Sequence, residues 1–197
     1  QIKRSFGGSG YRFMIDLEGA YNFDEALRLG EQMGHELFVW LEAPIPDDRL
    51  DEYAELRKVL DVLVLPAGYD YCSAEFISGG IQHAAWDAGR FDVANVGGVS
   101  AALELLQIAN EGDMPIEMQS WGHSLLQAAN LHLMLANSAT QYFEAPMPKT
   151  AYELGMADGN LILQGQAVAP NLPGLGLSVD WDALPAAEYY VHSRLDL

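Results

Sequence analysis

Short apolar segments that end in a polar residue recur along this chain, and their spacing limits the folds that it can adopt. The segment ends lie 23 to 27 residues apart. Strands and helices that alternate at this length predict βαβ units and a parallel sheet. The polar residues at the segment ends are Asp16, Glu42, Tyr69 followed by Asp70, Asp92, Gln119 and Glu144.

Helical patterns fill the intervals between these segments. In residues 22–34, Asn22 is followed three residues later by Glu25, which is the spacing of a capping box at a helix N-terminus. Residues 48–60 and 98–112 show the three-four apolar period of amphipathic helices, and residues 124–136 indicate a more thoroughly buried helix.

A polar residue at the end of each strand favours an α/β fold of the (β/α)₈ TIM-barrel type, because chemistry in such barrels lies at the carboxyl ends of the strands. A doubly wound open sheet shares the alternation and is the alternative. The first 16 residues hold a strand candidate, "QIK", then a glycine-rich stretch and the strand that ends at Asp16. A parallel crossover needs at least about 10–12 residues, so it does not fit there. We therefore predict a single barrel domain over residues 1–197, incomplete at its N-terminus, and expect native sequence to be missing before Gln1 and around "GGSG".

The net charge and the composition argue against nucleic-acid-binding, membrane-spanning and disulfide-bonded classes of protein. A net charge of −18 argues against nucleic acid as a partner, because a phosphate backbone would be repelled. An acidic substrate would need a cation or a local lysine to hold it in this field. We find no apolar run of the roughly 18 residues that a membrane span needs. Cys72 is the single cysteine, which excludes an internal disulfide and fits a reducing compartment, so we expect a cytoplasmic protein.

Several motifs together resemble the barrel domain of the enolase superfamily, in its mandelate racemase and muconate-lactonizing branch. They are "MID" at Asp16, "WLEAP" at Glu42, "DAGRFDVANVGG" around Asp92, "MPIEMQSWG", and "PGLGLSVDWDAL" near the C-terminus. The resemblance covers nearly the whole chain, as strands two to eight of the family pattern plus a C-terminal tail. It implies a site in which carboxylates on three successive strands bind Mg²⁺ and a base removes the proton α to a substrate carboxylate. We expect the family's N-terminal capping domain to be absent.

The resemblance implies metal ligands at Asp16 and Glu42. The family's third carboxylate position is occupied by Tyr69, and we expect the adjacent Asp70 to substitute, with Glu18 as a second candidate. From the residues alone, Asp16 and Glu42 end adjacent strands, and hard oxygen ligands of this kind suit Mg²⁺. Two like charges placed side by side are unfavourable without a cation between them. The alternative is that these carboxylates cap neighbouring helices.

The resemblance also implies catalytic and substrate-binding positions. Lys3 matches the second lysine of a lysine-x-lysine base motif, with Gln1 in the place of the first. Asp92 matches the aspartate of an Asp–His dyad, although it could equally cap a helix. Gln119 stands in the place of the dyad's histidine, and we expect it to contact the substrate. His123 is expected as an acid, a base or an exposed loop residue, Trp121 as part of a pocket mouth, and Glu144 as a hydrogen-bond partner of the substrate carboxylate.

These assignments predict a Mg²⁺-dependent lyase that dehydrates an acid sugar, with His123 helping to expel the β-hydroxyl group. Gln119 in place of the histidine favours one-base elimination over two-base racemisation. A racemase or cycloisomerase of the same superfamily is the first alternative. The second is a non-catalytic or truncated relative that acts as a scaffold. The expected partner is a small-molecule carboxylate, with no nucleic acid and no membrane, and we expect a homo-oligomer.

Overall fold

The computed structural model describes residues 2–34, 37–137, 140–149, 152–157 and 161–184. Helices and strands alternate along most of the chain. The helices are α1 (Ile2–Phe6), α2 (Phe23–Gln32), α3 (Leu50–Val59), α4 (Ala74–Gln82), α5 (Val99–Glu111), α6 (Ser124–Ala136) and the 3-10 helix η2 (Trp181–Ala183). The strands are β1 (Phe13–Asp16), β2 (Phe38–Glu42), β3 (Leu63–Leu65), β4 (Gly89–Phe91), β5 (Ile116–Met118), β6 (Ile162–Leu163) and β7 (Gln166–Ala167).

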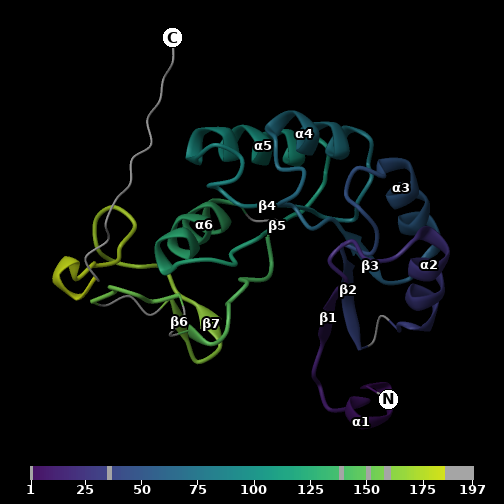
Figure 1. Ribbon diagram of the computed structural model, residues 1–197, viewed down its shortest axis with the longest axis horizontal. Coiled ribbons are helices and arrows are strands. Elements are labelled where there is room, and N and C mark those ends of the chain that lie inside the picture. Colours follow the sequence, from purple (N-terminus) through teal and green to yellow (C-terminus); the bar gives the residue numbers. More distant parts are fainter. Residues whose placement is uncertain (1, 35–36, 138–139, 150–151, 158–160, 185–197) are drawn as a thin grey trace.

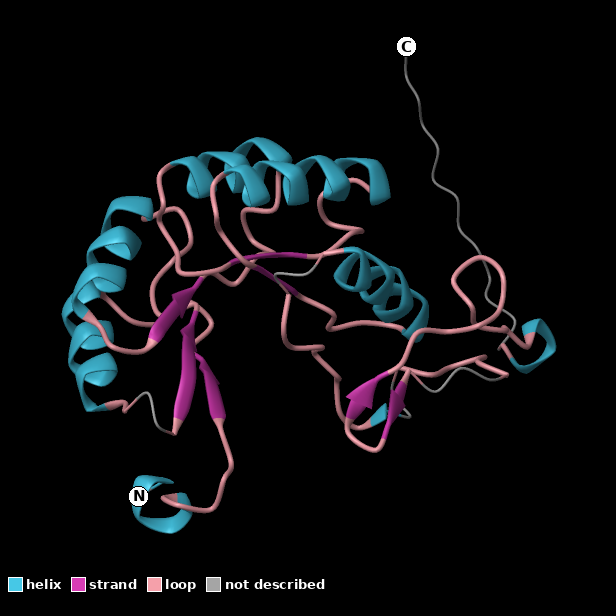
Figure 2. Cartoon of the chain, turned by 180° about the vertical axis from the view of Figure 1, so that it is seen from behind, coloured by secondary structure: helices cyan, strands magenta, loops and turns pink. Residues whose placement is uncertain are grey.

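The strands before residue 120 pair in parallel, as the alternation predicts. β1, β2 and β3 form one sheet in that order, and β4 pairs with β5 in a second sheet. A short antiparallel hairpin, β6–β7, follows. Helices α2 to α5 lie along the convex side of the arc that the chain forms, and the strands lie on its inner side (Figures 1 and 2). The α/β fold with parallel strands is confirmed, but within the described residues these sheets do not close into a barrel.

Two predicted strands are not strands in the structure. Ile2 and Lys3 of the "QIK" segment belong to helix α1, and Gly7 N donates a hydrogen bond to Lys3 O at the end of this helix. Gln1 lies outside the described residues. The "TQYFE" segment, where the resemblance implies strand eight, lies beside β5 but has no ladder pairing among its described residues. Its backbone N–H groups at Gln141 and Tyr142 donate to the carboxylate of Glu117, so a side chain takes the place of a neighbouring strand.

The predicted helices form where their sequence patterns place them. Asn22 and Glu25 form the expected capping box, with Glu25 N donating to Asn22 Oδ1 and Asn22 N donating to Glu25 Oε2. Helix α6 spans the predicted buried segment at residues 124–136. Helices α5 and α6 have 13 residues each, and none of the described helices combines the length and the apolar character needed to cross a membrane.

The two faces of the strands have different roles because successive side chains in a strand point to opposite faces. Val64 of β3 and Phe91 of β4 are fully buried in the main core, which the helices contribute to from outside. Trp40 and Glu42 of β2 share the opposite face and line a pocket on the inner side of the arc. The fold therefore presents the strand-end side chains to one concave surface.

Candidate active site

A pocket of about 650 Å³ lies at the carboxyl ends of the strands. Its wall combines carboxylates, one guanidinium group and aromatic rings. The lining residues are Met14, Asp16, Glu18, Trp40, Glu42, Tyr69, Arg90, Gln119, Trp121, Tyr142, Phe143 and Glu144. Each of the first five parallel strands, or the residues directly after it, contributes to this pocket.

Asp16 and Glu42 lie side by side because β1 and β2 pair in parallel with these two residues in register. Glu42 is 8% exposed, and its Oε2 accepts a hydrogen bond of 3.0 Å from Nε1 of Trp40. Burial raises the pKa of Glu42 to about 7; Arg90 opposes this rise, and Asp16 adds to it. Burial also raises the pKa of Asp16, against the hydrogen bond from the N–H of Glu18. Two neighbouring carboxylates at the predicted strand ends are therefore present in the site.

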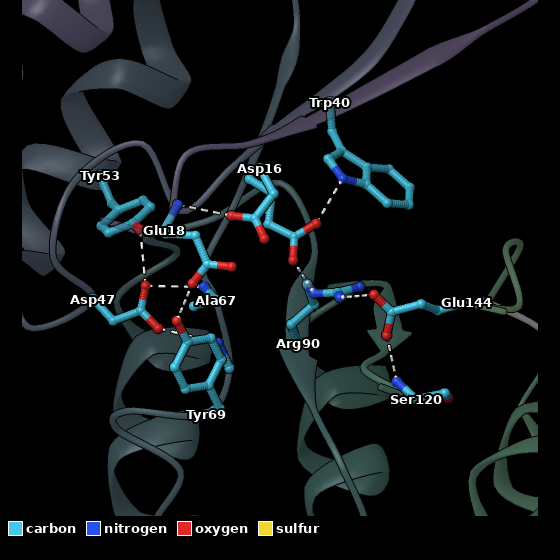
Figure 3. A network of polar contacts seen from close by, with 12 residues as sticks. Asp16, Glu18, Trp40, Asp47, Tyr53, Ala67, Tyr69, Arg90, Ser120 and Glu144 are labelled. Carbon is cyan, nitrogen blue, oxygen red and sulfur yellow. Dashed lines mark hydrogen bonds and ion pairs between the residues drawn. The ribbon is translucent and has the colours of Figure 1, made fainter. Parts of the chain in front are cut away.

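Arg90, in the middle of β4, is the principal site residue that the sequence reasoning missed. Its side chain is 3% exposed and reaches two carboxylates: Nε lies 2.9 Å from Glu42 Oε1, and Nη2 lies 3.1 Å from Glu144 Oε1. Figure 3 shows the guanidinium group turned toward Glu144. A buried charge needs a partner. An arginine between the buried residues of the short segment "GRFD" was the signal that could have identified this cation.

Glu144 is held at the pocket by two contacts. Its Oε1 pairs with Arg90, and its Oε2 accepts a 2.5 Å hydrogen bond from Ser120 N, just beyond β5. The preceding residues are fixed by Glu117, as described above, and the ring of Tyr142 packs edge-on against Trp40 with centroids 5.3 Å apart. The segment around Glu144 thus forms one wall of the pocket without being a strand.

The end of β3 presents a tyrosine to the pocket. The Tyr69 hydroxyl group donates to Glu18 Oε2 (Figure 3). The buried Asp47 sets this position, because its carboxylate accepts hydrogen bonds from the backbone N–H groups of Ala67 and Gly68 and from the Tyr53 hydroxyl group. Sequence reasoning did not single out Asp47, which positions the β3–α4 loop rather than lining the pocket.

Gln119 and Trp121 lie on the pocket wall after β5. The backbone of this loop is held by the fully buried Asn130 of α6, whose Nδ2 donates to Gln119 O and whose Oδ1 accepts from Val93 N. Gln119 Oε1 is buried and has no hydrogen-bond partner in the described part of the chain. Trp121 also lines the pocket, is 54% exposed and packs edge-on against Tyr152.

Four predicted site residues are not among those that line the pocket. Lys3 is on α1 and lines a separate cavity, and Asp70 is exposed beside Tyr69. The carboxylate of Asp92 accepts from the N–H groups two and three residues later, so it caps the turn after β4. His123 caps α6 through Nδ1, and its Nε2 lies 2.9 Å from Leu154 O. Both ring nitrogens of His123 thus face backbone groups. Gln1, the other half of the implied lysine motif, lies outside the described residues.

The predicted set of three magnesium ligands is not assembled. Asp16 and Glu42 lie together, but Tyr69 stands at the end of the third strand, and Asp70 is outside the pocket. Within the described ranges, no three His, Cys, Asp or Glu side chains are grouped as a metal site. Both oxygens of Glu42 are already contacted, one by a guanidinium group that would repel Mg²⁺. Because Mg²⁺ demands near-octahedral oxygen coordination, this donor set does not fit the ion.

Comparison with known proteins places this geometry in a family. The family model described as Enolase C-terminal domain-like matches residues 1–183. The chain belongs to this family. The resemblance drawn from the sequence motifs is therefore confirmed.

Characterised relatives in this enolase-like family are enzymes. The chain is 29% identical over 182 residues to an arabinonate dehydratase of Saccharolobus solfataricus, covering 89% of this chain and 47% of the relative. It is 25% identical over 186 residues to a D-galactarolactone cycloisomerase of Agrobacterium fabrum, covering 90% of this chain and 49% of the relative. The chain spans about half the length of both.

Solved structures agree on the fold. A protein from Pseudovibrio sp., assigned to the mandelate racemase/muconate lactonizing enzymes, superposes with a TM-score of 0.86 at 32% identity, over 92% of this chain and 49% of that one. Structures of the same fold that are 20 and 21% identical to this chain hold magnesium. These structures share the fold of this chain.

Proposed function

We propose that this chain forms the carboxylate-binding part of an enolase-superfamily active site, and that the protein removes the proton α to the carboxylate of a small sugar acid, with loss of water. The observation that carries this proposal is the convergence of Asp16, Glu42, Glu144 and Arg90 in one pocket at the carboxyl ends of the strands. This is where the fold class places its chemistry.

The lining of the pocket suits a sugar acid. Such a ligand carries one carboxylate and several hydroxyl groups, and the wall offers a buried guanidinium group as well as polar side chains. Gln119 Oε1 has no hydrogen-bond partner within the described residues, and a ligand hydroxyl group would supply one after rotation of the amide. Trp40, Trp121 and Tyr142 provide ring faces and edges for the carbon skeleton. Gln119 and Trp121 are therefore proposed as substrate contacts.

We assign the removal of the α-proton to Asp16. Both oxygens of Glu42 are contacted by Arg90 and Trp40, and both oxygens of Glu144 by Arg90 and Ser120. Asp16 uses Oδ1 to accept from Glu18 N, which orients its carboxylate at the pocket wall. A general base must lie within hydrogen-bond reach of the proton that it removes, and the place of Asp16 on the pocket wall exposes its carboxylate to a ligand bound there.

The type of reaction and the need for a metal ion are the two further parts of this proposal. The relationship to a dehydratase favours elimination, and the relationship to a cycloisomerase makes isomerisation the second candidate, because both curated relatives match to a similar extent. Mg²⁺ is excluded from the proposed steps because the donor set does not fit it. A binding protein without catalysis remains the outcome if acids bind but do not react.

Exchange of the α-proton with solvent deuterium tests the proposal directly. The 197-residue chain is incubated in D₂O with arabinonate, galactarate and mandelate, once with EDTA and once with Mg²⁺, and the α-proton signal is followed by ¹H NMR. We expect loss of this signal for at least one sugar acid, together with a dehydrated product.

Matched variants sharpen the assay. Asp16→Asn should abolish the exchange, whereas Glu104→Gln, which removes an exposed carboxylate on α5, should leave it unchanged. An absence of exchange with all three acids under both conditions would contradict the proposal.

A further inference from the structure

The Arg90 guanidinium group is a fixed cation inside the candidate active site. It contacts Glu42 at 2.9 Å and Glu144 at 3.1 Å, and its charge also acts on Asp16. These carboxylates come from β1, β2 and the segment that follows α6, so one buried side chain attracts groups from three parts of the chain. Among the described residues that line the pocket, no other carries a positive charge.

The guanidinium group retains binding capacity. Arginine has five N–H donors in a planar fork, which matches the geometry of a carboxylate. The Nη2 group donates to Glu144, but the contact of Nε with Glu42 is an ion pair without hydrogen-bond geometry, and the buried Nε has no acceptor in the described part of the chain. The N–H groups of the fork that face neither Glu42 nor Glu144 are the donors that remain for a ligand carboxylate.

The charge of Arg90 offsets only part of the carboxylate charge around it. Asp16, Glu42 and Glu144 face this single guanidinium group, and the loop after the third strand contributes the neutral Tyr69 in place of a further carboxylate. Without Arg90 these carboxylates would repel one another, so the arginine serves as the cation that holds them together.

We propose that Arg90 is the built-in cation of this site: its guanidinium group offsets part of the charge of the strand-end carboxylates and binds the carboxylate of the substrate in place of a divalent metal ion. This inference rests on the proposed function, since it takes the ligand to be a small carboxylic acid. It goes beyond that function because it removes the metal requirement and assigns the substrate carboxylate to Arg90.

Binding of Mn²⁺, used as a spectroscopic substitute for Mg²⁺, tests the cation role without any substrate. Electron paramagnetic resonance titration of the full 197-residue chain should show no saturable site below millimolar concentration. Arg90→Gln leaves the carboxylates without their cation and should bind Mn²⁺ at least about tenfold more tightly than the parent. The double variant Arg90→Gln/Tyr69→Glu, which restores a third carboxylate, should bind more tightly still. Stoichiometric micromolar binding by the parent would overturn the inference.

A charge-conserving variant keeps the test valid if Arg90→Gln does not fold. Arg90→Lys keeps the positive charge but loses the planar fork. It should still exclude Mn²⁺ while binding arabinonate about ten- to hundredfold more weakly than the parent, as expected for lost charge-assisted hydrogen bonds. Equal affinities of Arg90→Lys and parent for arabinonate would remove Arg90 as the carboxylate ligand. Circular dichroism establishes that each variant is folded.

Calorimetry with arabinonate separates failure of this inference from failure of the proposed function. Parent binding that is equal in EDTA and in Mg²⁺ supports both. Binding that requires Mg²⁺ overturns the built-in cation but leaves the proposed function intact. A parent that excludes Mn²⁺ and binds none of the three acids in either buffer overturns the substrate role of Arg90 together with the proposed function.

Discussion

The Nε atom of Arg90 lies 2.9 Å from Oε1 of Glu42, so a buried guanidinium group on β4 faces a buried carboxylate on β2 across the boundary between two separate sheets. No backbone ladder joins β3 to β4 in the described residues. This ion pair and the loop that Asp47 holds are therefore among the contacts that set the two sheets beside one another. Its energetic role can be measured independently of any substrate.

Arg90→Met should destabilise the chain by about 3–5 kcal/mol, because it leaves Glu42 buried without its partner. Adding Glu42→Gln to this variant should recover part of the loss, since the unpaired charge is then removed. Urea unfolding of the parent, both single variants and the double variant measures this coupling. Arg49→Met, which removes a surface ion pair with Glu52, is the control and should change stability by less than about 1 kcal/mol. Strict additivity of the two buried changes would show that the pair is not coupled.

The raised pKa of Glu42 gives stability a defined pH dependence. The ordinary pKa is 4.5 and the value in the folded state is about 7. Between these two pH values the folded state binds more protons than the unfolded state. The contribution of Glu42 to stability is therefore greatest below about pH 4.5, falls as the pH rises to about 7, and is constant at higher pH. The loss is at most about 3.5 kcal/mol, at about 1.4 kcal/mol for each pKa unit.

Urea midpoints at pH 5 and pH 8 check the contribution of Glu42. The parent should be less stable at pH 8, and Glu42→Gln should lose less stability between the two values because glutamine does not titrate. Asp16, Asp47 and Glu117 also have raised pKa values, so the variant should keep a smaller fall of the same sign. An identical fall in parent and variant would show that Glu42 is not the titrating group.

Asp47→Asn should cost about 1–3 kcal/mol of stability, because an amide N–H₂ group cannot accept the hydrogen bonds that both carboxylate oxygens receive from Tyr53, Ala67 and Gly68. The β3–α4 loop should loosen with it and displace Tyr69 from the pocket. Thermal unfolding gives the stability change, and hydrogen exchange of the Ala67 and Gly68 amides reports the local effect. Asp61→Asn, at an exposed carboxylate, is the control. Unchanged protection of these amides would contradict the positioning role.

Gly68→Ala should be more damaging than Gly97→Ala, although both glycines have positive φ, at 79° and 98°. A Cβ atom on Gly68 would lie 2.5 Å from the backbone oxygen of Arg90, whereas a Cβ atom on Gly97 would meet no atom within 4 Å. Both variants incur backbone strain of about 1–3 kcal/mol, and Gly68→Ala must also move the β3–α4 loop away from Arg90 of β4. Chemical denaturation of the two variants compares these losses. Equal losses would show that the close approach to Arg90 has no energetic consequence.

Much of this protein followed from local sequence patterns. Asn22 and Glu25 predicted the start of α2, because capping depends on residues that are close in the chain. The spacing of apolar segments predicted six parallel strands, of which the first five are present and the sixth, ending at Glu144, is not a strand. The adjacency of Asp16 and Glu42 followed as well, since parallel neighbours of equal spacing bring their ends together. Gln119 and Trp121, which follow β5, line the same pocket.

Only the tertiary structure decided which side chains complete the site. Tyr69 rather than Asp70 faces Glu18 because Asp47, more than twenty residues earlier, fixes the loop backbone. His123 is occupied by backbone partners on both sides of its ring, including Leu154, which no local pattern could reveal. Arg90 became the central cation only when β2, β4 and the segment at Glu144 met. Repeating short-range geometry fixes where strands end, but the direction of a side chain beyond a strand depends on hydrogen bonds and charges contributed by distant parts of the chain.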